Sequence, residues 1–327
     1  MLLLACFAGG CASRPLPKPQ APEAVLPPPR VEKFREPLEV TPLEIHFSGL
    51  RGATRANESV AVKNTGTQAV QVSDLRVVGP NAMTFKIAST PLLPLVLAPG
   101  MSFSFLVGFE PGLDADPGVH YARVRIVRSE DDDGPPCDLT GLVSRGTAAS
   151  DEPPLQQILE ALGYAVDVGS PSLALPAGPL GDEIPARQFL RAKPGNVGYY
   201  LIARYTDEKD SAFGTYVVEK GKPVGKEIGR AGKGQCRTLN PELEGDSQTS
   251  FDPQEAAFGL YLAVGNRTSY ADPALNPAPH KPVARVYPLR SRGRTLVQDA
   301  FVVAFDENGD DDFQDHVFML WNVKPAP

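Results

Sequence analysis

Apolar and polar residues alternate along several short stretches in the first half of the chain, between residues 38 and 146. Every second position is apolar in two of these stretches, at Phe103, Phe105, Val107 and Phe109 and again at Ala122, Val124 and Ile126. Turn-forming residues such as Asn64-Thr65-Gly66 separate the stretches. A period of two predicts strands with one apolar face. Repeated short strands with turns between them predict a β-sandwich.

The second half, residues 152–327, begins with a different period. Leu155, Ile158, Leu159 and Leu162 are spaced as on one face of a short helix, and Gly163 follows where helices commonly end. Apolar stretches separated by Gly, Pro and Asn then return at 199–205, 215–218, 258–264, 285–289, 301–305 and 317–323. They predict a second β-sandwich, with the lone tryptophan, Trp321, in its core.

The first eleven residues, MLLLACFAGGC, are apolar and end in small residues before a cysteine, which is typical of an export signal rather than a fold element. Residues 8–11 resemble the processing site of bacterial lipoproteins, with Cys11 as the lipidated residue, although Ala8 stands where leucine is usual. The resemblance implies attachment to the outer membrane, because no aspartate follows Cys11. An ordinary cleaved secretory signal is the alternative. Residues 12–37 are rich in proline and predict an extended linker.

Composition narrows the range of partners. The net charge is −7 and the isoelectric point is about 5.3, which argues against nucleic acid, because its phosphates require a basic surface. No apolar stretch reaches the roughly 18 residues of a membrane-spanning helix. Beyond the signal the cysteines are Cys137 and Cys236. An exported protein could join them, and two separate thiols are the other interpretation.

The order of phrases in residues 38–146 is more specific than the alternation. VAVKNTGTQAV, with its N-T-G turn, precedes LAPGMSFSFLVGFEP, and YARVRIV and CDLTGLV follow. This order resembles the ASH/hydin-type immunoglobulin-like domain of exported bacterial proteins. The resemblance implies a binding or spacer module without catalytic residues. The expected fold class is therefore all-β, with two β-sandwich domains, the first immunoglobulin-like and the second with one short N-terminal helix.

The loop from Asp306 to Asp315 carries six acidic side chains and no basic one. Packing carboxylates together is costly because they repel one another, and calcium relieves this by binding about six to eight oxygen ligands. The predicted ligands are Asp306, Asn308, Asp310, Asp312 and Asp315. The loop is not an EF-hand, because its glycine is the fourth residue and strands flank it. A solvated hairpin loop that binds no ion is the alternative.

Two phrases near the end of the chain, AAFGLYLAVGNRTSY and GDDDFQDHVFMLWNV, resemble a C-terminal β-domain of unknown function in exported bacterial proteins. The residues that match its G-D-x-D-F-x-D-x-V motif are Gly309, Asp310, Asp312, Phe313, Asp315 and Val317. The resemblance implies an extracellular module without a named ligand.

Common catalytic motifs, such as G-x-S-x-G and H-E-x-x-H, are missing from the sequence. We therefore expect a non-catalytic cell-envelope lipoprotein that uses calcium in binding or adhesion to a polysaccharide or protein ligand. A purely structural envelope scaffold is the first alternative, and a calcium-assisted hydrolase is the second.

The basic residues Lys281, Arg285, Arg290, Arg292 and Arg294 predict a solvated hairpin, with contact to anionic envelope polymers as the alternative.

Overall fold

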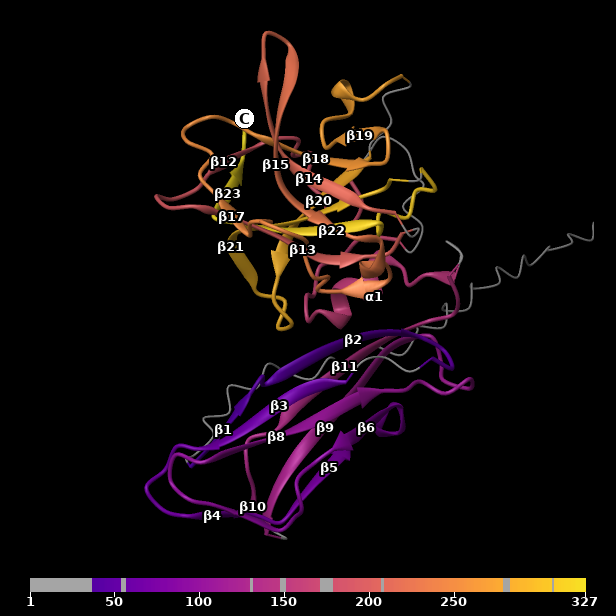
Figure 1. Cartoon of the computed structure of the whole chain (residues 1–327). Helices are drawn as coiled ribbons and strands as arrows, with labels where there is room; N and C mark the ends of the chain where they lie inside the picture. Colours follow the sequence, from indigo (N-terminus) through magenta and orange to yellow (C-terminus); the bar gives the residue numbers. More distant parts are fainter. Residues whose placement is uncertain are drawn as a thin grey trace, which may run out of the picture.

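The computed structural model describes residues 37–53, 57–129, 132–147, 151–170, 179–206, 209–278, 283–307 and 309–327. Within these ranges the chain consists of strands and turns, with α1 (Leu155–Ala161) as its α-helix. Figure 1 shows two β-rich bodies, one coloured indigo to magenta and the other salmon to yellow, with α1 on the side of the second that faces the first. The expected fold class, all-β with two sandwiches and one short helix, is confirmed. No helix in the described ranges is long and apolar enough to cross a membrane.

The first sandwich has two main sheets. One has the strand order β1 (Leu38–Thr41), β3 (Glu58–Asn64), β8 (Ser102–Phe109) and β6 (Phe85–Ser89). The other has the order β10 (Asp132–Asp133), β9 (Gly118–Ser129), β11 (Cys137–Ser144) and β2 (Glu44–Leu50), with β5 (Asp74–Val78) also paired to β9. A separate pair joins β4 (Val70–Val72) to β7 (Leu95–Leu97). The β2–β11 pairing is parallel, whereas β9 is antiparallel to both β11 and β5.

The interior of the first sandwich is apolar and aromatic. Phe47, Phe85 and Phe109 form a cluster with ring centroids 5.1 to 6.0 Å apart. Gly141 of β11 lies against this cluster, and a Cβ at that position would be 2.2 Å from the ring of Phe109. Glycine is required there because the buried ring occupies the space of a side chain.

The second sandwich is built from a six-stranded and a four-stranded sheet. The six-stranded sheet has the order β16 (Thr238–Leu239), β13 (Val197–Arg204), β22 (His316–Trp321), β21 (Leu296–Phe305) and β20 (Ala284–Arg290), with β17 (Ser250–Phe251) also on β13. The four-stranded sheet has the order β15 (Lys222–Ala231), β14 (Ser211–Glu219), β18 (Gly259–Val264) and β19 (Arg267–Tyr270). A third, two-stranded sheet joins β12 (Phe189–Arg191) to β23 (Val323–Pro325). In the described ranges, short 3-10 turns are η1 (Ala82–Thr84) in the first sandwich, and η3 (Lys233–Gln235) and η4 (Pro273–Leu275) in the second.

Both faces of the six-stranded sheet are covered. One face shares an aromatic core with the four-stranded sheet, and the other packs against α1. This explains the uninterrupted apolar runs in β21 and β22, because a strand buried on both sides does not alternate. The prediction that Trp321 is a core residue is wrong: its relative exposure is 55%. The cross-strand neighbours of Trp321 are Gly198 and Ala300, which are too small to cover an indole ring.

Helix α1 connects the two sandwiches. Its buried face carries Leu155, Ile158 and Leu159, as the spacing predicts, and Gly163 follows with φ of 79°. The same apolar cluster includes Leu142 of β11 from the first sandwich. Side-chain hydrogen bonds add to this contact, because Ser48 lies 2.6 Å from the hydroxyl of Tyr205. The two sandwiches are therefore in direct contact over the face of β2 and β11.

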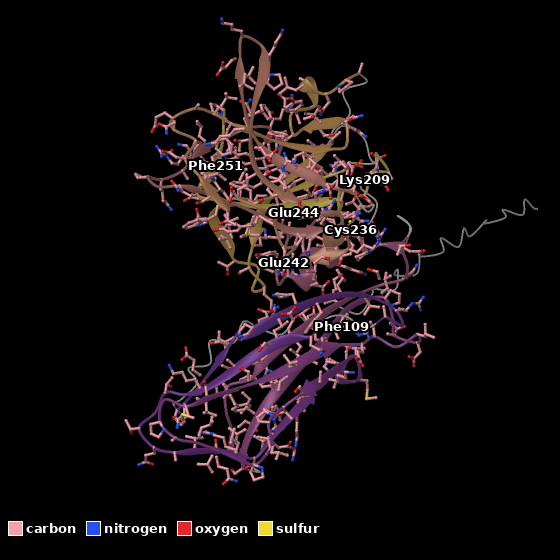
Figure 2. The ribbon with its side chains drawn as sticks, in the orientation of Figure 1. Phe109, Lys209, Cys236, Glu242, Glu244 and Phe251 are labelled. Carbon is pink, nitrogen blue, oxygen red and sulfur yellow. The ribbon has the colours of Figure 1, made fainter. Side chains whose placement is uncertain are left out.

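The cysteines beyond the N-terminal segment are not joined. Cys137 is buried, and Cys236, labelled in Figure 2, is partly exposed; the two form no disulfide. The interpretation as two separate thiols is confirmed. Burial raises the pKa of Cys137 to about 12, so that thiol is chemically inert at neutral pH.

Candidate functional site

The acidic loop joins two adjacent strands of the six-stranded sheet. β21 ends at Phe305 and β22 begins at His316, and these two residues are paired in the ladder. The loop therefore leaves and re-enters the sheet at one point, which brings its first and last residues together. Asp306 and Asp315, at these two positions, are both 2% exposed. Asn308 and Cys11 lie outside the described residues.

Four of the predicted ligands converge. One carboxylate oxygen from each of Asp306, Asp310, Asp312 and Asp315 can be chosen so that all four lie within 4.8 Å of one another. Asp310 is exposed and Asp312 is partly exposed, so the group opens to solvent on the side opposite the two buried aspartates. This spacing is suited to a shared cation, because calcium binds carboxylate oxygens at about 2.3–2.6 Å.

Backbone turns hold the loop in this shape. Gly309, Asp311 and Phe313 all have positive φ, at 77°, 66° and 56°. Asp306 accepts hydrogen bonds from the backbone N–H of Gly309 at 2.6 Å and of Asp311 at 3.1 Å. The left-handed conformation is costly for an aromatic residue. The ring of Phe313 is fixed by burial at 1% exposure and by the guanidinium of Arg285, 4.7 Å from its centroid.

The electrostatics of the loop are unfavourable to the ionised carboxylates. Burial raises the pKa of Asp306. Burial, followed by the neighbouring carboxylate of Asp310, raises the pKa of Asp312 to about 7. Within the described residues no lysine or arginine forms an ion pair with these three aspartates. A divalent cation would supply the missing positive charge and lower these pKa values.

Glu307 and Asp311 do not join the four aspartates. Glu307 accepts a hydrogen bond from Thr206 at 3.0 Å, and its backbone carbonyl accepts one from Arg267 at 2.6 Å. Its carboxylate therefore binds the segment that follows β13, at Thr206, and is not part of the cluster. Of the six acidic side chains in the loop, four form the candidate centre.

Two residues beside the cluster were not predicted. The side-chain amide of Gln314 is 1% exposed, donates to Glu152 at 3.4 Å, and has an oxygen without a hydrogen-bond partner among the described residues. Burial raises the pKa of Glu152 to about 7, Arg237 opposes this rise, and Asp310 adds to it. Glu152 stands before α1, far from the loop in sequence, so no local pattern could identify it.

Glu152 also connects the loop to the first sandwich. Its carboxylate lies 3.1 Å from Nε of Arg237. Arg237 donates to the carbonyl of Thr147 at 2.8 Å, and its own carbonyl accepts a bond from Ser48 at 2.9 Å. The acidic loop and the contact between the sandwiches therefore share one ion pair.

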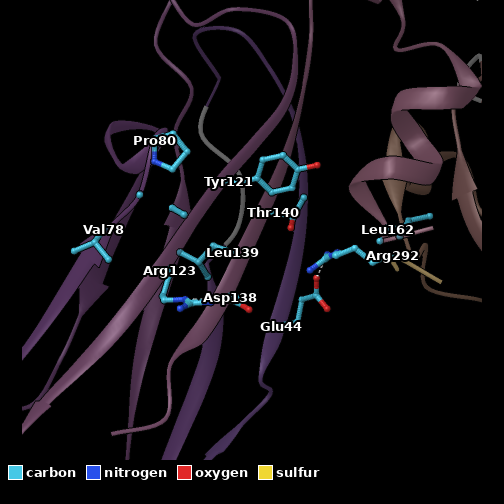
Figure 3. Close-up of a pocket in the computed structure, with 13 residues that line it drawn as sticks. Glu44, Val78, Pro80, Tyr121, Arg123, Asp138, Leu139, Thr140, Leu162 and Arg292 are labelled. Carbon is cyan, nitrogen blue, oxygen red and sulfur yellow. Dashed lines mark hydrogen bonds and ion pairs between the residues drawn. The ribbon is translucent and has the colours of Figure 1, made fainter. Parts of the chain in front are cut away.

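A cavity of about 590 Å³ lies beside that contact. Figure 3 shows Tyr121, Thr140 and Asp138 on strands of the first sandwich, with Arg292 reaching across from the second to pair with Glu44. The hydroxyl of Tyr121 donates to Glu160 of α1 at 3.3 Å. The lining mixes opposite charges with apolar residues, which is typical of binding sites at domain interfaces.

The basic stretch that contains Arg292 forms the predicted hairpin, between β20 and β21, but three of its arginines are held in ion pairs rather than left in solvent. Arg285 pairs with Glu183, Arg290 with Asp182 at 2.9 Å, and Arg292 with Glu44. Their partners lie far away in sequence, so folding neutralises three arginines of a stretch that contains no acidic residue of its own. Lys281 lies outside the described residues.

A buried serine and histidine lie together in the second sandwich. Oγ of Ser211 is 3.0 Å from Nε2 of His316. Nε of Arg204 donates to the same nitrogen at 3.1 Å, which places the ring proton on Nδ1. Burial and the charge of Arg204 hold the pKa of His316 well below its usual range. All three side chains are at most 2% exposed, so in this conformation the pair has no access to a dissolved substrate.

No protein-family model matches the chain, and no curated protein matches its sequence. Solved structures give weak similarities. A secreted serine protease, VesC from Vibrio cholerae, aligns over 87% of this chain at 13% identity with a TM-score of 0.26, and the alignment spans about half (49%) of that protein's length. An ASH/PapD-like domain of human CEP192 aligns over 36% of this chain and 94% of its own at 14% identity and a TM-score of 0.21. The periplasmic chaperone SfaE aligns over 71% and 98% at 8% identity and a TM-score of 0.25. These scores are too low to carry an argument about function.

Proposed function

We propose that the protein is a non-catalytic binding module of the bacterial cell envelope and that its acidic loop binds calcium. The observation that supports the metal site best is the convergence of Asp306, Asp310, Asp312 and Asp315 within 4.8 Å. These residues are spread over ten positions of the loop, and they come together where it joins the ends of β21 and β22. Two of the four carboxylates are buried there.

The chemistry of the donors favours calcium over other cations. All four side chains offer hard oxygen atoms, which suit calcium or magnesium rather than zinc or copper. Calcium takes about six to eight such ligands in flexible geometry, whereas magnesium demands a near-octahedral arrangement. The amide oxygen of Gln314, buried and without a hydrogen-bond partner among the described residues, is a further donor of the right kind.

The envelope location rests on the sequence. An apolar segment ending at Cys11 and a proline-rich segment at 12–37 support export and lipid attachment to the outer membrane. The phrases of residues 38–146 support an ASH/hydin-type immunoglobulin-like module. In this proposal the ligand is a polysaccharide or protein of the envelope or its surroundings, and the cavity between the sandwiches is the candidate place for it.

Calcium titration of the full chain by calorimetry, with a parallel thermal melt, tests the metal site. The Asp310→Asn/Asp312→Asn variant removes two carboxylates without changing side-chain size. Asp311→Asn is the matched control, because it removes a charge from the same loop outside the cluster, and asparagine tolerates the left-handed backbone at that position.

We expect dissociation constants of about 10⁻⁴–10⁻³ M, as in other extracellular calcium modules. At a hundredfold excess of calcium the native state should gain about 2.7 kcal/mol. Wild type and Asp311→Asn should both show heat and a raised melting temperature, and the double variant neither. If wild type shows neither, the calcium site is refuted.

A structural envelope scaffold is the second candidate, and one observation favours it. Asp306 already accepts two backbone N–H groups of its own loop, and Asp315 accepts the N–H of Glu307. Such bonds stiffen a loop without any ion. An unresponsive wild type in the calcium titration would make this scaffold the leading hypothesis.

A further inference from the structure

The hairpin of β14 and β15 extends beyond the sheet that supports it. β18 pairs with β14 only from Ser211 to Tyr216, whereas β15 pairs with β14 as far as Glu219. Residues 217–224 therefore form a two-stranded ribbon, and Figure 1 shows this hairpin projecting from the second sandwich at the top of the view. A ribbon of two strands has no core of its own and is marginally stable in water.

The end of this ribbon is apolar on both faces. Directly opposed residues of an antiparallel pair share a face. Val218 opposes Pro223 on one face, and Val224 opposes Val217 on the other. Val217 is partly buried against the core of the second sandwich, so Val224 is the outer apolar residue of that face. Val218 is 44% exposed and Val224 47% exposed. A flat protein surface would cover one face and leave the other in water, whereas a medium that surrounds the tip would cover both.

The charge at the tip is opposite to that of the whole chain. Between residues 217 and 226 there are three lysines, Lys220, Lys222 and Lys226, against one carboxylate, Glu219. All three lysines are exposed, and none forms an ion pair within the described ranges. The tip thus carries a local excess of two positive charges on a protein whose net charge is −7.

The turn between β14 and β15 does not carry the residues that would make it most stable. Lys220 and Gly221 have φ of 51° and 77°, the signature of a two-residue turn with both residues left-handed, in which asparagine or aspartate is preferred before glycine. Lysine at that position adds strain where a better residue is available, and strained residues concentrate at functional sites.

We propose that this tip, residues 217–226, inserts into the headgroup layer of an anionic lipid bilayer. Val218, Pro223 and Val224 enter the interface, and the lysines contact the lipid phosphates. Pro223 lacks an N–H and interrupts the free edge of β15, which disfavours a partner that adds a strand. The inference goes beyond the proposed function and requires neither calcium nor the lipid anchor.

A protective role is the competing explanation, because lysine and proline on an edge strand also prevent sheet-to-sheet association. Charge reversal separates the two roles. Lys220→Glu/Lys222→Glu keeps a charged, protected edge but repels an anionic surface. Lys63→Glu/Lys324→Glu is the matched control, because it makes the same change in net charge at exposed lysines on other strands.

The test is co-sedimentation of the full chain, carrying Cys11→Ser so that no acyl chain is attached, with lipid vesicles in EDTA. Wild type and the control should bind phosphatidylglycerol-rich vesicles more than pure phosphatidylcholine vesicles, with the difference lost in high salt. A lysine at an anionic surface contributes about fivefold to partitioning, so the tip variant should bind at least about 25-fold more weakly. Val218→Ser/Val224→Ser should also weaken binding while leaving its salt dependence intact.

Three outcomes would overturn the proposal. One is wild-type binding that does not distinguish the two kinds of vesicle. Another is a tip variant that binds as well as the control. A concentration-dependent dimer that the tip variant loses would assign the tip to self-association instead. EDTA keeps these outcomes separate from the calcium titration, because the acidic loop has no cation to bind in this assay.

Discussion

Asp312→Asn should stabilise the protein in the absence of calcium and destabilise it in the presence of calcium. Burial and the carboxylate of Asp310 raise the pKa of Asp312 from 3.8 to about 7. At about 1.4 kcal/mol per pH unit this rise corresponds to about 4 kcal/mol. Because the loop is partly open to water, we halve this to about 2 kcal/mol to account for solvent screening.

The direction of the pH dependence follows from the same rise. Between about pH 4 and pH 7 the folded protein holds a proton on Asp312 that the unfolded chain has lost, so its stability falls as the pH rises through that window. The cost is fully present above about pH 7. Asparagine cannot ionise and keeps the size of the side chain, so the variant should escape the cost at pH 8.

Urea unfolding in EDTA at pH 8 and pH 5 measures this effect. The fluorescence of Trp321, the one tryptophan, reports on the second sandwich. We expect Asp312→Asn to gain about 2 kcal/mol over wild type at pH 8 and much less at pH 5, with the order of stability reversed by excess calcium. Asp311→Asn, which lies outside the cluster, should change stability by less than about 0.5 kcal/mol. A variant that is less stable than wild type in EDTA at pH 8 would refute the repulsion on which the metal proposal depends.

Three further predictions concern the fold. Gly141→Ala places a Cβ 2.2 Å from the buried ring of Phe109, and should lower the free energy of unfolding by about 1–3 kcal/mol; a change below 0.5 kcal/mol by urea unfolding, on the order of a surface substitution, would contradict the packing. Trp321→Ala should cost less than about 1 kcal/mol in the same assay, against about 3–5 for a buried aromatic residue, because the indole is 55% exposed. In a variant with Cys6→Ser and Cys11→Ser, Cys236 should react with a thiol reagent in the folded state and Cys137 only after unfolding. Equal reaction rates would argue against the buried position of Cys137.

Local pattern predicted the longer strands in two ways, as alternation in strands such as β9 and as continuous apolar runs in β21 and β22. The period of two around Phe105 and the helical spacing from Leu155 both match the structure. The pattern fails for a strand that extends beyond the core and for the end of a strand that is buried on both faces. The segment 222–231 was not predicted as a strand, because the outer part of β15 is exposed and carries no apolar alternation. Trp321 was assigned to the core because β22, buried on both faces along most of its length, has no alternation to show where burial ends.

The residues of the candidate site also fall into two groups: those that local sequence could predict and those that only tertiary packing brings to the site. Asp306, Asp310, Asp312 and Asp315 could be predicted because they belong to one loop between adjacent strands, where closeness in sequence ensures closeness in space. Glu152 could not, because only the packing of the segment before α1 against the loop brings it there. Sequence alone also cannot show that Glu44, on β2, neutralises Arg292 across the domain contact.

The position of Glu152 predicts that calcium binding in the loop stabilises the contact between the two sandwiches. Asp310 adds to the rise in the pKa of Glu152, and the ion pair of Glu152 with Arg237 opposes it. A cation beside Asp310 would offset that repulsion, keep Glu152 ionised and strengthen its pair with Arg237, which donates to the carbonyl of Thr147. The amide of Arg145, bonded to Asp151 at 3.1 Å, should then exchange its hydrogen more slowly in calcium than in EDTA. Glu152→Gln should remove this difference while leaving calcium binding detectable by calorimetry. If calcium binds to wild type and the exchange of residues 144–147 does not change, the loop and the contact are independent, because the shared ion pair is the connection through which the charge would act.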